Sequence, residues 1–167
     1  MTVGIGARGI RRVLYPVGLL AAIVAAVLAG AGPSMAAQSS DTRLTFYSGY
    51  NGYGNIVCSI YLSPSTTLQD VNFKTDPYGC ENDDTKSVRF VSSAVDYRGV
   101  QLTVFNDSSC RTTSDYAVTR IQPLNRSARV NSFEQNFVAG SITHTYHYRS
   151  GDLDGKVSCI RFQRLPV

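Results

Sequence analysis

Apolar and polar residues alternate in short runs over most of the chain beyond residue 43. A period of two places successive side chains on opposite faces of a β-strand, and runs with the 3.6-residue period of a helix are hard to find. Turns rich in Gly, Asn, Asp and Pro separate the runs, as is typical of a β-sandwich or barrel. We predict an all-β fold, a β-sandwich, with strands in 44–47, 57–62, 88–91, 100–105, 117–121, 142–148 and 157–162.

The beginning of the chain follows another pattern. Arg8, Arg11 and Arg12 precede an apolar run over 13–31, and Gly32-Pro33 ends that run. A basic start, an apolar centre and small residues at the end are typical of a secretory signal peptide. The adjacent Arg11 and Arg12 also fit twin-arginine export, so the export route stays open.

The small residues after the apolar run set the boundary of this leader. We expect a signal peptide over 1–36, cleaved after Ala36 or Ala37, and then a single domain over 37–167. The protein is then secreted and extracellular, has no membrane association after cleavage, and carries a leader of bacterial type. An uncleaved membrane anchor over the same apolar run is the alternative.

Removal of the leader changes the charge. The whole chain has a formal net charge of +4, and the three leader arginines account for most of it, so the remaining domain is near +1. No basic stripe stands out in that domain. We therefore expect no nucleic-acid partner.

All four cysteines lie beyond the leader, and an even number in an exported chain predicts two disulfides. Three pairings are possible. The spacing favours Cys58 with Cys80 and Cys110 with Cys159, one closure in each half of the domain. A zinc site is not expected, because the CxxC spacing of such sites is absent.

One segment occurs twice in the domain. Residues 82–90 read NDDTKSVRF and residues 154–162 read DGKVSCIRF, so each copy passes from polar side chains into an apolar-Arg-Phe strand. The halves match at their first strands with an offset of 58 residues and at these loops with an offset of 72. We predict an internal duplication with an insertion in the second half. The insertion should include Leu124–Asn136, a long loop or a short helix before a strand at Phe137.

The repeated loops offer carboxylates, hydroxyls and carbonyls, which are the hard oxygen ligands that calcium prefers. A calcium site is one interpretation of the loops. Two tight acidic turns that lead into core strands are the other. The candidate ligand positions are Asn82, Asp83, Asp84, Asp154, Lys156 and Ser158.

Two motifs in the chain resemble those of the βγ-crystallin superfamily, including its secreted microbial members. One is an aromatic residue, six residues and a glycine, which Tyr47 and Gly54 match. The other is Asn/Asp-Asn/Asp-x-x-Ser/Thr-Ser before an apolar-Arg-apolar strand, which both copies of the repeated loop match in part. The resemblance implies two Greek-key motifs in one sandwich, over about 43–98 and about 99–165.

The chain departs from the family pattern in ways that weaken calcium binding. Lys86 stands where the family has a hydroxyl ligand, and its ammonium group repels a divalent ion. Gly155 removes a carboxylate from the second copy, whereas Ser158 keeps the hydroxyl, and Thr112 replaces the glycine at the second motif start. We expect weak Ca²⁺ binding at most, at one site centred on Ser158.

No residue pattern points to catalysis, and we expect a protein that is not an enzyme. The motifs Gly-x-Ser-x-Gly and His-Glu-x-x-His are absent from the sequence. His144 and His147 lie three apart on a predicted strand, so they point to opposite faces and cannot easily share an ion. Both are expected to be exposed.

An aromatic cluster follows the first predicted strand, and glycines separate its members. The cluster either packs on its own sheet or presents a surface to a carbohydrate or protein partner. Its residues are Phe46, Tyr47, Tyr50 and Tyr53.

We expect a monomer that works by binding, and two classes of function stay open. One is a secreted βγ-crystallin-like binding domain with weak calcium binding. The other, implied by the resemblance, is a metalloproteinase inhibitor or an antifungal killer-toxin-like protein, with an extracellular protease or a cell-surface component as partner. An inhibitor needs a rigid exposed loop, for which Cys58–Cys80 and Ser108–Tyr116 are the candidate segments.

Overall fold

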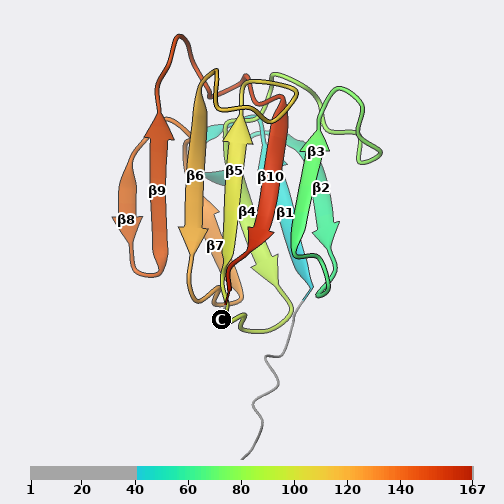
Figure 1. Cartoon of the computed structure of the whole chain (residues 1–167), viewed down its shortest axis with the longest axis vertical. Coiled ribbons are helices and arrows are strands. Elements are labelled where there is room, and N and C mark those ends of the chain that lie inside the picture. Colours follow the sequence, from blue (N-terminus) through green and yellow to red (C-terminus); the bar gives the residue numbers. More distant parts are fainter. Residues whose placement is uncertain (1–40, 167) are drawn as a thin grey trace, which may run out of the picture. The chain divides into compact units, whose positions relative to one another are not determined.

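The computed structural model describes residues 41–166, which form ten β-strands and no α-helix (Figure 1). The predicted leader over 1–36 lies outside the described residues. No helix in the described part is long and apolar enough to cross a membrane. The strands are β1 (Thr42–Tyr47), β2 (Ile56–Leu62), β3 (Leu68–Asn72), β4 (Ser87–Ser92), β5 (Val100–Phe105), β6 (Tyr116–Ile121), β7 (Ser127–Val130), β8 (Phe137–Ala139), β9 (Ile142–His147) and β10 (Cys159–Arg164), and a short 3₁₀ turn, η1 (Tyr50–Gly52), follows β1.

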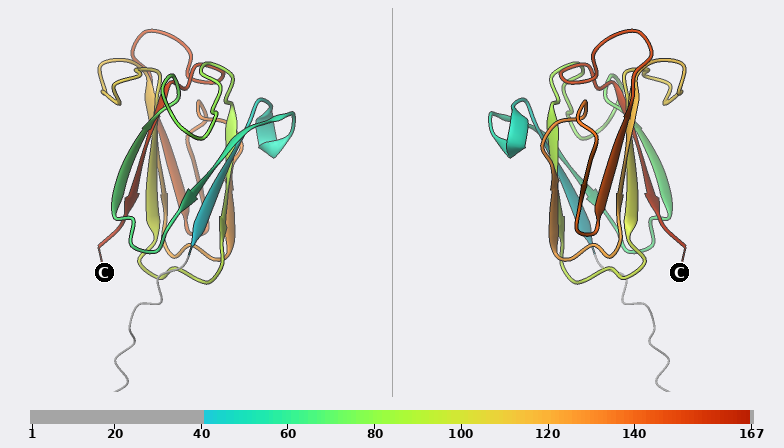
Figure 2. Two further views of the ribbon diagram at one scale, coloured as in Figure 1. Left: turned by 90° about the vertical axis from the view of Figure 1, so that its right-hand side faces the viewer. Right: turned by 90° about the vertical axis from the view of Figure 1, so that its left-hand side faces the viewer.

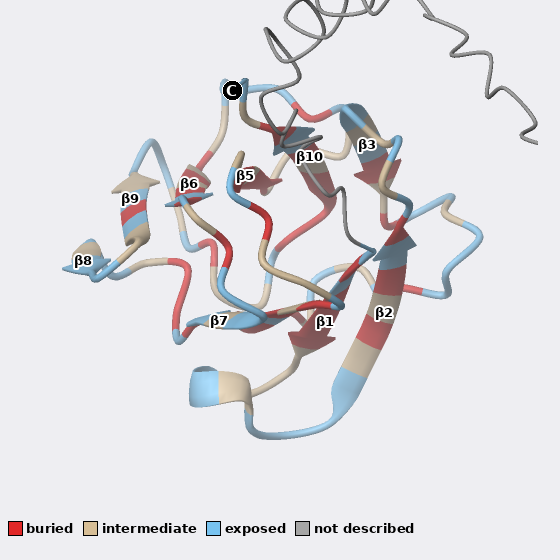
Figure 3. Ribbon diagram, turned by 90° about the horizontal axis from the view of Figure 1, so that it is seen from below, coloured by how far each residue is buried: buried red, intermediate tan, exposed pale blue. Residues whose placement is uncertain are grey.

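The strands form two antiparallel sheets, with the orders β2-β1-β4-β7 and β3-β10-β5-β6-β9-β8. Figure 2 shows the sheets as two layers that face each other. One buried core lies between them, with Leu44 and Phe46 of β1 on one side and Leu102 and Phe162 on the other. Figure 3 shows buried residues alternating with less buried ones along β2, which is the pattern expected when one face of a strand meets the core. The all-β prediction is confirmed for the described part.

In each half of the domain, three strands belong to one sheet and one strand belongs to the other sheet. β1, β2 and β4 lie together, whereas β3 pairs with β10 in the second sheet. In the same way β5, β6 and β10 lie together, whereas β7 pairs with β4 in the first sheet. The elements β3 and β7 are thus exchanged between the two layers.

The insertion in the second half is the hairpin of β8 and β9, which extends the second sheet beyond β6. The prediction for Leu124–Asn136 is therefore wrong in part, because this stretch contains β7, the counterpart of β3. The strand expected at Phe137 is present as β8. β10 begins at Cys159, two residues later than the alternation predicts.

Two disulfides close the two halves with the pairing that the spacing favours. Cys58 of β2 bonds to Cys80 in the connection between β3 and β4. Cys110 bonds to Cys159 at the start of β10. Each stabilises the fold by about 2–4 kcal/mol, chiefly by restricting the unfolded chain.

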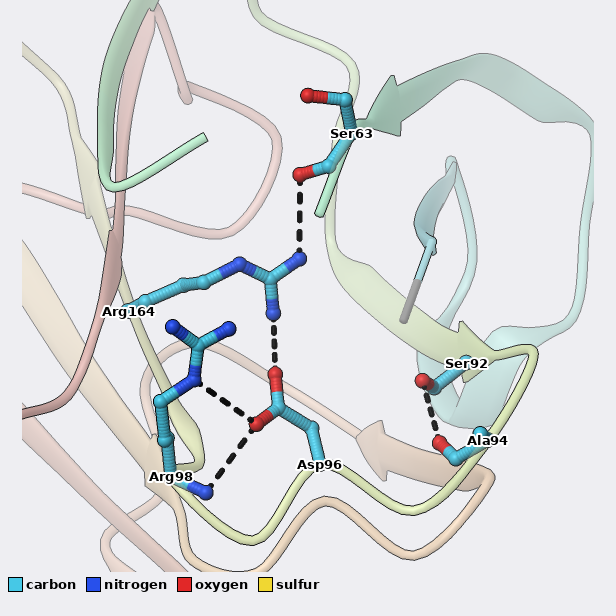
Figure 4. A network of polar contacts seen from close by, with 6 residues as sticks. All are labelled: Ser63, Ser92, Ala94, Asp96, Arg98 and Arg164. Carbon is cyan, nitrogen blue, oxygen red and sulfur yellow. Dashed lines mark hydrogen bonds and ion pairs between the residues drawn. The ribbon is translucent and has the colours of Figure 1, made fainter. Parts of the chain in front are cut away.

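A buried carboxylate fixes the end of β10 (Figure 4). Asp96 is 1% exposed and Arg164 is 6% exposed, and the Arg164 guanidinium donates to the Asp96 carboxylate and to the Ser63 carbonyl. The backbone N–H of Arg98 donates to the same carboxylate at 3.1 Å, and Arg98 Nε lies 3.6 Å from it. The connections after β2 and β4 are thereby tied to β10.

Candidate functional site

The two repeated loops lie side by side and bond to each other reciprocally. The N–H of Asp83 donates to the Val157 carbonyl (3.3 Å), and the N–H of Gly155 donates to the Thr85 carbonyl (2.9 Å). Asp83 and Gly155 hold the same position in the two copies, as do Thr85 and Val157. The duplication read from the sequence therefore extends to individual hydrogen bonds.

The local conformation explains why the two loops match. Asp83 and Gly155 both have positive φ angles, 68° and 81°. Glycine adopts this left-handed conformation freely, and aspartate is among the residues that tolerate it best. Thr85 and Val157, two positions later, are fully buried and anchor the loops in the core.

Three oxygen atoms of the candidate calcium ligands converge near Ser158. Its hydroxyl donates a hydrogen bond to Asp83 Oδ1 (3.2 Å), and its Oγ lies 3.5 Å from the main-chain carbonyl oxygen of Lys156, the alternative acceptor. Calcium–oxygen distances of 2.3–2.6 Å place neighbouring ligand oxygens roughly 3–3.5 Å apart, so this spacing fits a shared ion. The ammonium group of Lys156 takes no part and lies 3.7 Å from the Asp152 carboxylate.

The Ser158 group is a sparse ligand set. Asp83 supplies its one carboxylate, and Ser158 itself is 3% exposed. Within residues 41–166 no cluster of three or more His, Cys, Asp or Glu side chains could hold a metal. Because calcium takes six to eight oxygen ligands, an ion here would need several water molecules, which fits low affinity.

The related position in the other copy does not fit calcium. It holds Lys86 in place of the hydroxyl and Gly155 in place of the carboxylate. Lys86 Nζ lies 5.6 Å from the centre of the Tyr50 ring, a cation–π distance. A fixed positive charge therefore stands where the other copy gathers oxygen atoms.

Asp154 has partners of its own, outside the Ser158 group. Its carboxylate accepts hydrogen bonds from the Phe133 N–H (2.8 Å) and the Ser132 hydroxyl (2.6 Å). Burial raises the pKa of Asp154, and these two hydrogen bonds oppose that rise. Glu134 accepts from the Asp154 N–H (3.0 Å), which further ties this loop to the segment after β7.

A polar cavity of about 490 Å³ lies beside Asp154, and Tyr50 and Glu134 also line it. The negative charge of Asp154, with burial, raises the pKa of Tyr50. The roles of Ser132 and Glu134 were not predicted, since no signal in the sequence connects their segment with a loop about 20 residues later.

Asn82 and Asp84 make no hydrogen bond to the Ser158 group in the described contacts. Asn82 Oδ1 is buried and has no hydrogen-bond partner among the described residues. Asp84 is half-buried. Of the six predicted ligand positions, the fold thus brings three together: Asp83, Lys156 and Ser158.

The prediction that His144 is exposed is wrong. His144 is 1% exposed, with Nδ1 2.7 Å from the Thr119 hydroxyl and Nε2 3.1 Å from the Phe133 carbonyl oxygen. Because a carbonyl only accepts, Nε2 donates and Nδ1 accepts. His147 is half-buried and stacks on Tyr116 on the opposite face of β9, so the two histidines are separated as predicted.

The aromatic cluster divides between core and surface. Phe46 is fully buried, whereas Tyr50 and Tyr53 are 50% and 71% exposed in and beside η1. Phe46 thus packs in the core, whereas Tyr50 and Tyr53 are accessible on the surface, and a partner for them stays a prediction.

No protein-family model matches this chain, and no curated protein or solved structure matches it. The assignment of a function therefore rests on the residues of the chain itself.

Proposed function

We propose that this protein is a secreted, non-catalytic binding domain of the βγ-crystallin type with one calcium site of low affinity at Ser158. The observation that carries the proposal is the meeting of the Asp83, Lys156 and Ser158 oxygens across two reciprocally bonded loops. Extracellular calcium modules work at 10⁻⁴–10⁻³ M, the range that a site with one carboxylate suits.

The strand order supports the family part of the proposal. In a Greek key the fourth strand returns to lie beside the first. Here β4 lies beside β1, and β10 lies beside β5 with the same register between the paired strands. Two such motifs that exchange their third strands would give the observed orders of both sheets.

The two disulfides support an extracellular location. Disulfides persist in oxidising compartments and are rare in the cytosol, and small exported domains use them to supplement a limited core. This agrees with the leader read from the sequence, which lies outside the described residues.

Calcium titration of the purified protein tests the proposal. We expect calorimetry to show one ion per molecule with a dissociation constant near a millimolar. Ten dissociation constants of free Ca²⁺ should stabilise the fold by about 1.4 kcal/mol, a rise of a few degrees in Tm. Absence of heat and of any rise in Tm up to 10 mM Ca²⁺ would rule out the site.

Three variants localise the site. Asp83→Asn removes the only carboxylate of the Ser158 group, and Ser158→Ala removes its hydroxyl, so both should abolish the calcium-dependent rise in Tm. Asp84→Asn, a matched loss of charge from the same loop, should retain it. Equal effects of Asp83→Asn and Asp84→Asn, with no effect of Ser158→Ala, would show a general electrostatic attraction instead of a site.

One observation favours a protease inhibitor as a second candidate function. The connection between β3 and β4 is held by the Cys58–Cys80 disulfide, and Asp76 Oδ1 accepts from the N–H groups of Tyr78 and Cys80, both at 3.2 Å. Tyr78 is 37% exposed on this braced loop. A preordered exposed loop loses little entropy on entering a protease cleft.

Incubation with a thermolysin-like metalloproteinase tests this candidate. Stoichiometric loss of protease activity, weakened by Tyr78→Ala, is the expected result. Digestion of the protein within the 73–86 connection, without inhibition, would eliminate the candidate.

A further inference from the structure

The outer face of the first sheet carries three exposed arginines, one on each of three neighbouring strands. Arg89 of β4 is directly opposite Arg129 of β7 in the register. Arg43 of β1 pairs with Val91, two residues along β4 from Arg89. All three arginines are exposed, because the residues on either side of each point into the core.

No negative charge balances these arginines on their own sheet. The strands β1, β2, β4 and β7 contain no Asp or Glu. Among the ion pairs of residues 41–166, none includes Arg43, Arg89 or Arg129. The outer face of the second sheet differs, since Arg161 there forms a two-pronged pair with Asp70 at 2.7 Å.

Like charges directly opposite each other on a sheet are unfavourable for folding. Arg89 and Arg129 keep this arrangement without a carboxylate beside them, and a bound anion would relieve the repulsion. The sheet therefore has a physical reason to take an anionic partner.

Two of the arginines are held in position by the protein. The Arg129 guanidinium donates to the Asn51 carbonyl at 2.9 Å and lies against Gly52 of η1. The Arg43 guanidinium lies 6.0 Å from the centre of the Tyr61 ring, which is 66% exposed. Because their positions are fixed in part, both lose less freedom when they bind a ligand.

We propose that this face binds an anionic polysaccharide. Guanidinium groups form two-pronged contacts with carboxylate, sulfate and phosphate groups. Strand spacing places the backbone positions of Arg89 about 5–8 Å from those of Arg43 and Arg129, and those of Arg43 and Arg129 roughly 12 Å apart, so the charges form a row that suits a polymer with repeated negative charges. The exposed ring of Tyr61 beside Arg43 offers an apolar surface for a sugar ring.

A sugar polymer fits better than a nucleic acid. Two disulfides indicate an oxidising compartment outside the cytosol, where anionic glycans are the abundant polyanions. The face is independent of the proposed calcium site, since Asp83 and Ser158 lie in the repeated loops and not on these strands.

Binding to fluorescent polygalacturonate and dextran sulfate tests the proposal, with neutral dextran as the uncharged control. The two anionic probes separate carboxylate from sulfate as the preferred group, and both should bind. Three arginines should give a slope of about −2 for log affinity against log salt, so a rise from 50 to 200 mM NaCl weakens binding roughly 20-fold. The protein should not bind neutral dextran.

Arg89→Gln removes the central charge, which makes no hydrogen bond or ion pair in the described contacts. This variant should reduce the slope of log affinity against log salt concentration by about 0.7, and it should weaken the affinity at 50 mM salt about eightfold. Arg120→Gln is the matched control, because it removes one exposed arginine from β6 of the second sheet and should change the affinity less than twofold. Arg43→Gln is the second test variant and should act as Arg89→Gln does.

Four results would overturn the proposal. They are equal binding of neutral dextran, equal loss of affinity in Arg89→Gln and Arg120→Gln, tighter binding to duplex DNA or to anionic lipid vesicles than to either polysaccharide, and loss of binding in EDTA. The last result would attribute the binding to calcium. Persistence of binding in EDTA, with a failed calcium titration, would leave this inference standing without the proposed calcium site.

Discussion

Lys86 lies against Gly155: the Lys86 Cε atom is 3.4 Å from the point at which a Cβ on residue 155 would stand. In the other copy of the loop pair, Ser158 and Asp83 hold the same two positions, and their side chains are 3.2 Å apart. The lysine thus fills the space beside the missing carboxylate and adds a positive charge. One of the two related positions thus holds the oxygen atoms of Ser158 and Asp83, and the other holds the ammonium group of Lys86.

Restoring the two lost ligands should create a second calcium site. In the double variant Lys86→Thr and Gly155→Asp, a hydroxyl and a carboxylate replace the ammonium and the glycine. Aspartate is tolerable at residue 155, because Asp83 adopts the same left-handed conformation at the related position. Calorimetry should show the number of bound ions rising from one to two.

The single variant Lys86→Thr is the control for this experiment. It removes the charge and adds no carboxylate, so its stoichiometry should stay at one. A double variant that also stays at one would show that the two positions are less alike than their hydrogen bonds indicate.

The buried His144 should make stability depend on pH. Burial lowers the pKa of His144 in the folded protein, whereas an unfolded histidine titrates near 6.5. Below about pH 6.5 the unfolded state therefore binds a proton that the folded state resists, and the free energy of unfolding falls as the pH decreases towards the folded pKa. Urea unfolding between pH 7.5 and pH 5 measures the fall.

His144→Gln should flatten this dependence. A glutamine amide can donate to the Phe133 carbonyl and accept from Thr119, and it does not titrate. His147→Gln, at a half-buried position on the other face of β9, should retain most of the fall. If His144→Gln had the same pH profile as the unmodified protein, the attribution of the pH dependence to His144 would be contradicted.

The buried Asp96 should contribute far more to the free energy of unfolding than the exposed Asp70, although both pair with an arginine. Asp96→Asn leaves a buried Arg164 without its carboxylate and should destabilise the fold by about 3–5 kcal/mol. Asp70→Asn removes an ion pair in contact with solvent and should cost less than about 1 kcal/mol. Denaturant titrations of the two variants compare them directly, and equal losses would contradict the role of burial.

The two disulfides should differ in how much each contributes to the free energy of unfolding. Cys110–Cys159 closes 49 residues and Cys58–Cys80 closes 22, so loss of the first removes a larger restriction on the unfolded chain. We expect the paired Cys→Ser variants to lose about 4 and about 3.4 kcal/mol respectively. A larger loss from the shorter loop, measured by denaturant unfolding, would point to strain or residual structure instead of chain entropy.

Alternation identified the strands whose two faces differ clearly. β1 and β4 place exposed arginines between buried residues, and β5 alternates apolar with polar side chains up to Val104 although five of its six residues are buried, so the predicted positions of all three agree with the structure. β3 escaped prediction because Val71 is its one buried residue, and β7 escaped because it has four residues. Burial of His144 depends on Phe133 and Thr119, which come from distant segments, so a local pattern cannot predict it.

For the candidate sites too, the sequence reveals residues that are close along the chain and not residues that only the fold brings together. The repeated loops were visible because each is contiguous in the sequence, and three of their predicted ligand positions come together. The arginine face was not visible, since Arg43, Arg89 and Arg129 lie 40 or more residues apart and meet through the pairing of β1, β4 and β7. The overall charge of the domain conceals that concentration on one sheet.

The exchange of β3 and β7 between the layers also has a consequence for how fast this protein folds. β3 pairs with β10, a strand that begins 87 residues after β3 ends, and it has no other strand beside it. Such distant pairing closes a large loop before it gains any contact energy, and folds rich in such contacts form in milliseconds to seconds, well behind helical bundles. Until β10 arrives, β3 presents an unpaired edge that neighbouring chains can capture, so the risk of aggregation is concentrated in the interval before the second half of the chain has folded.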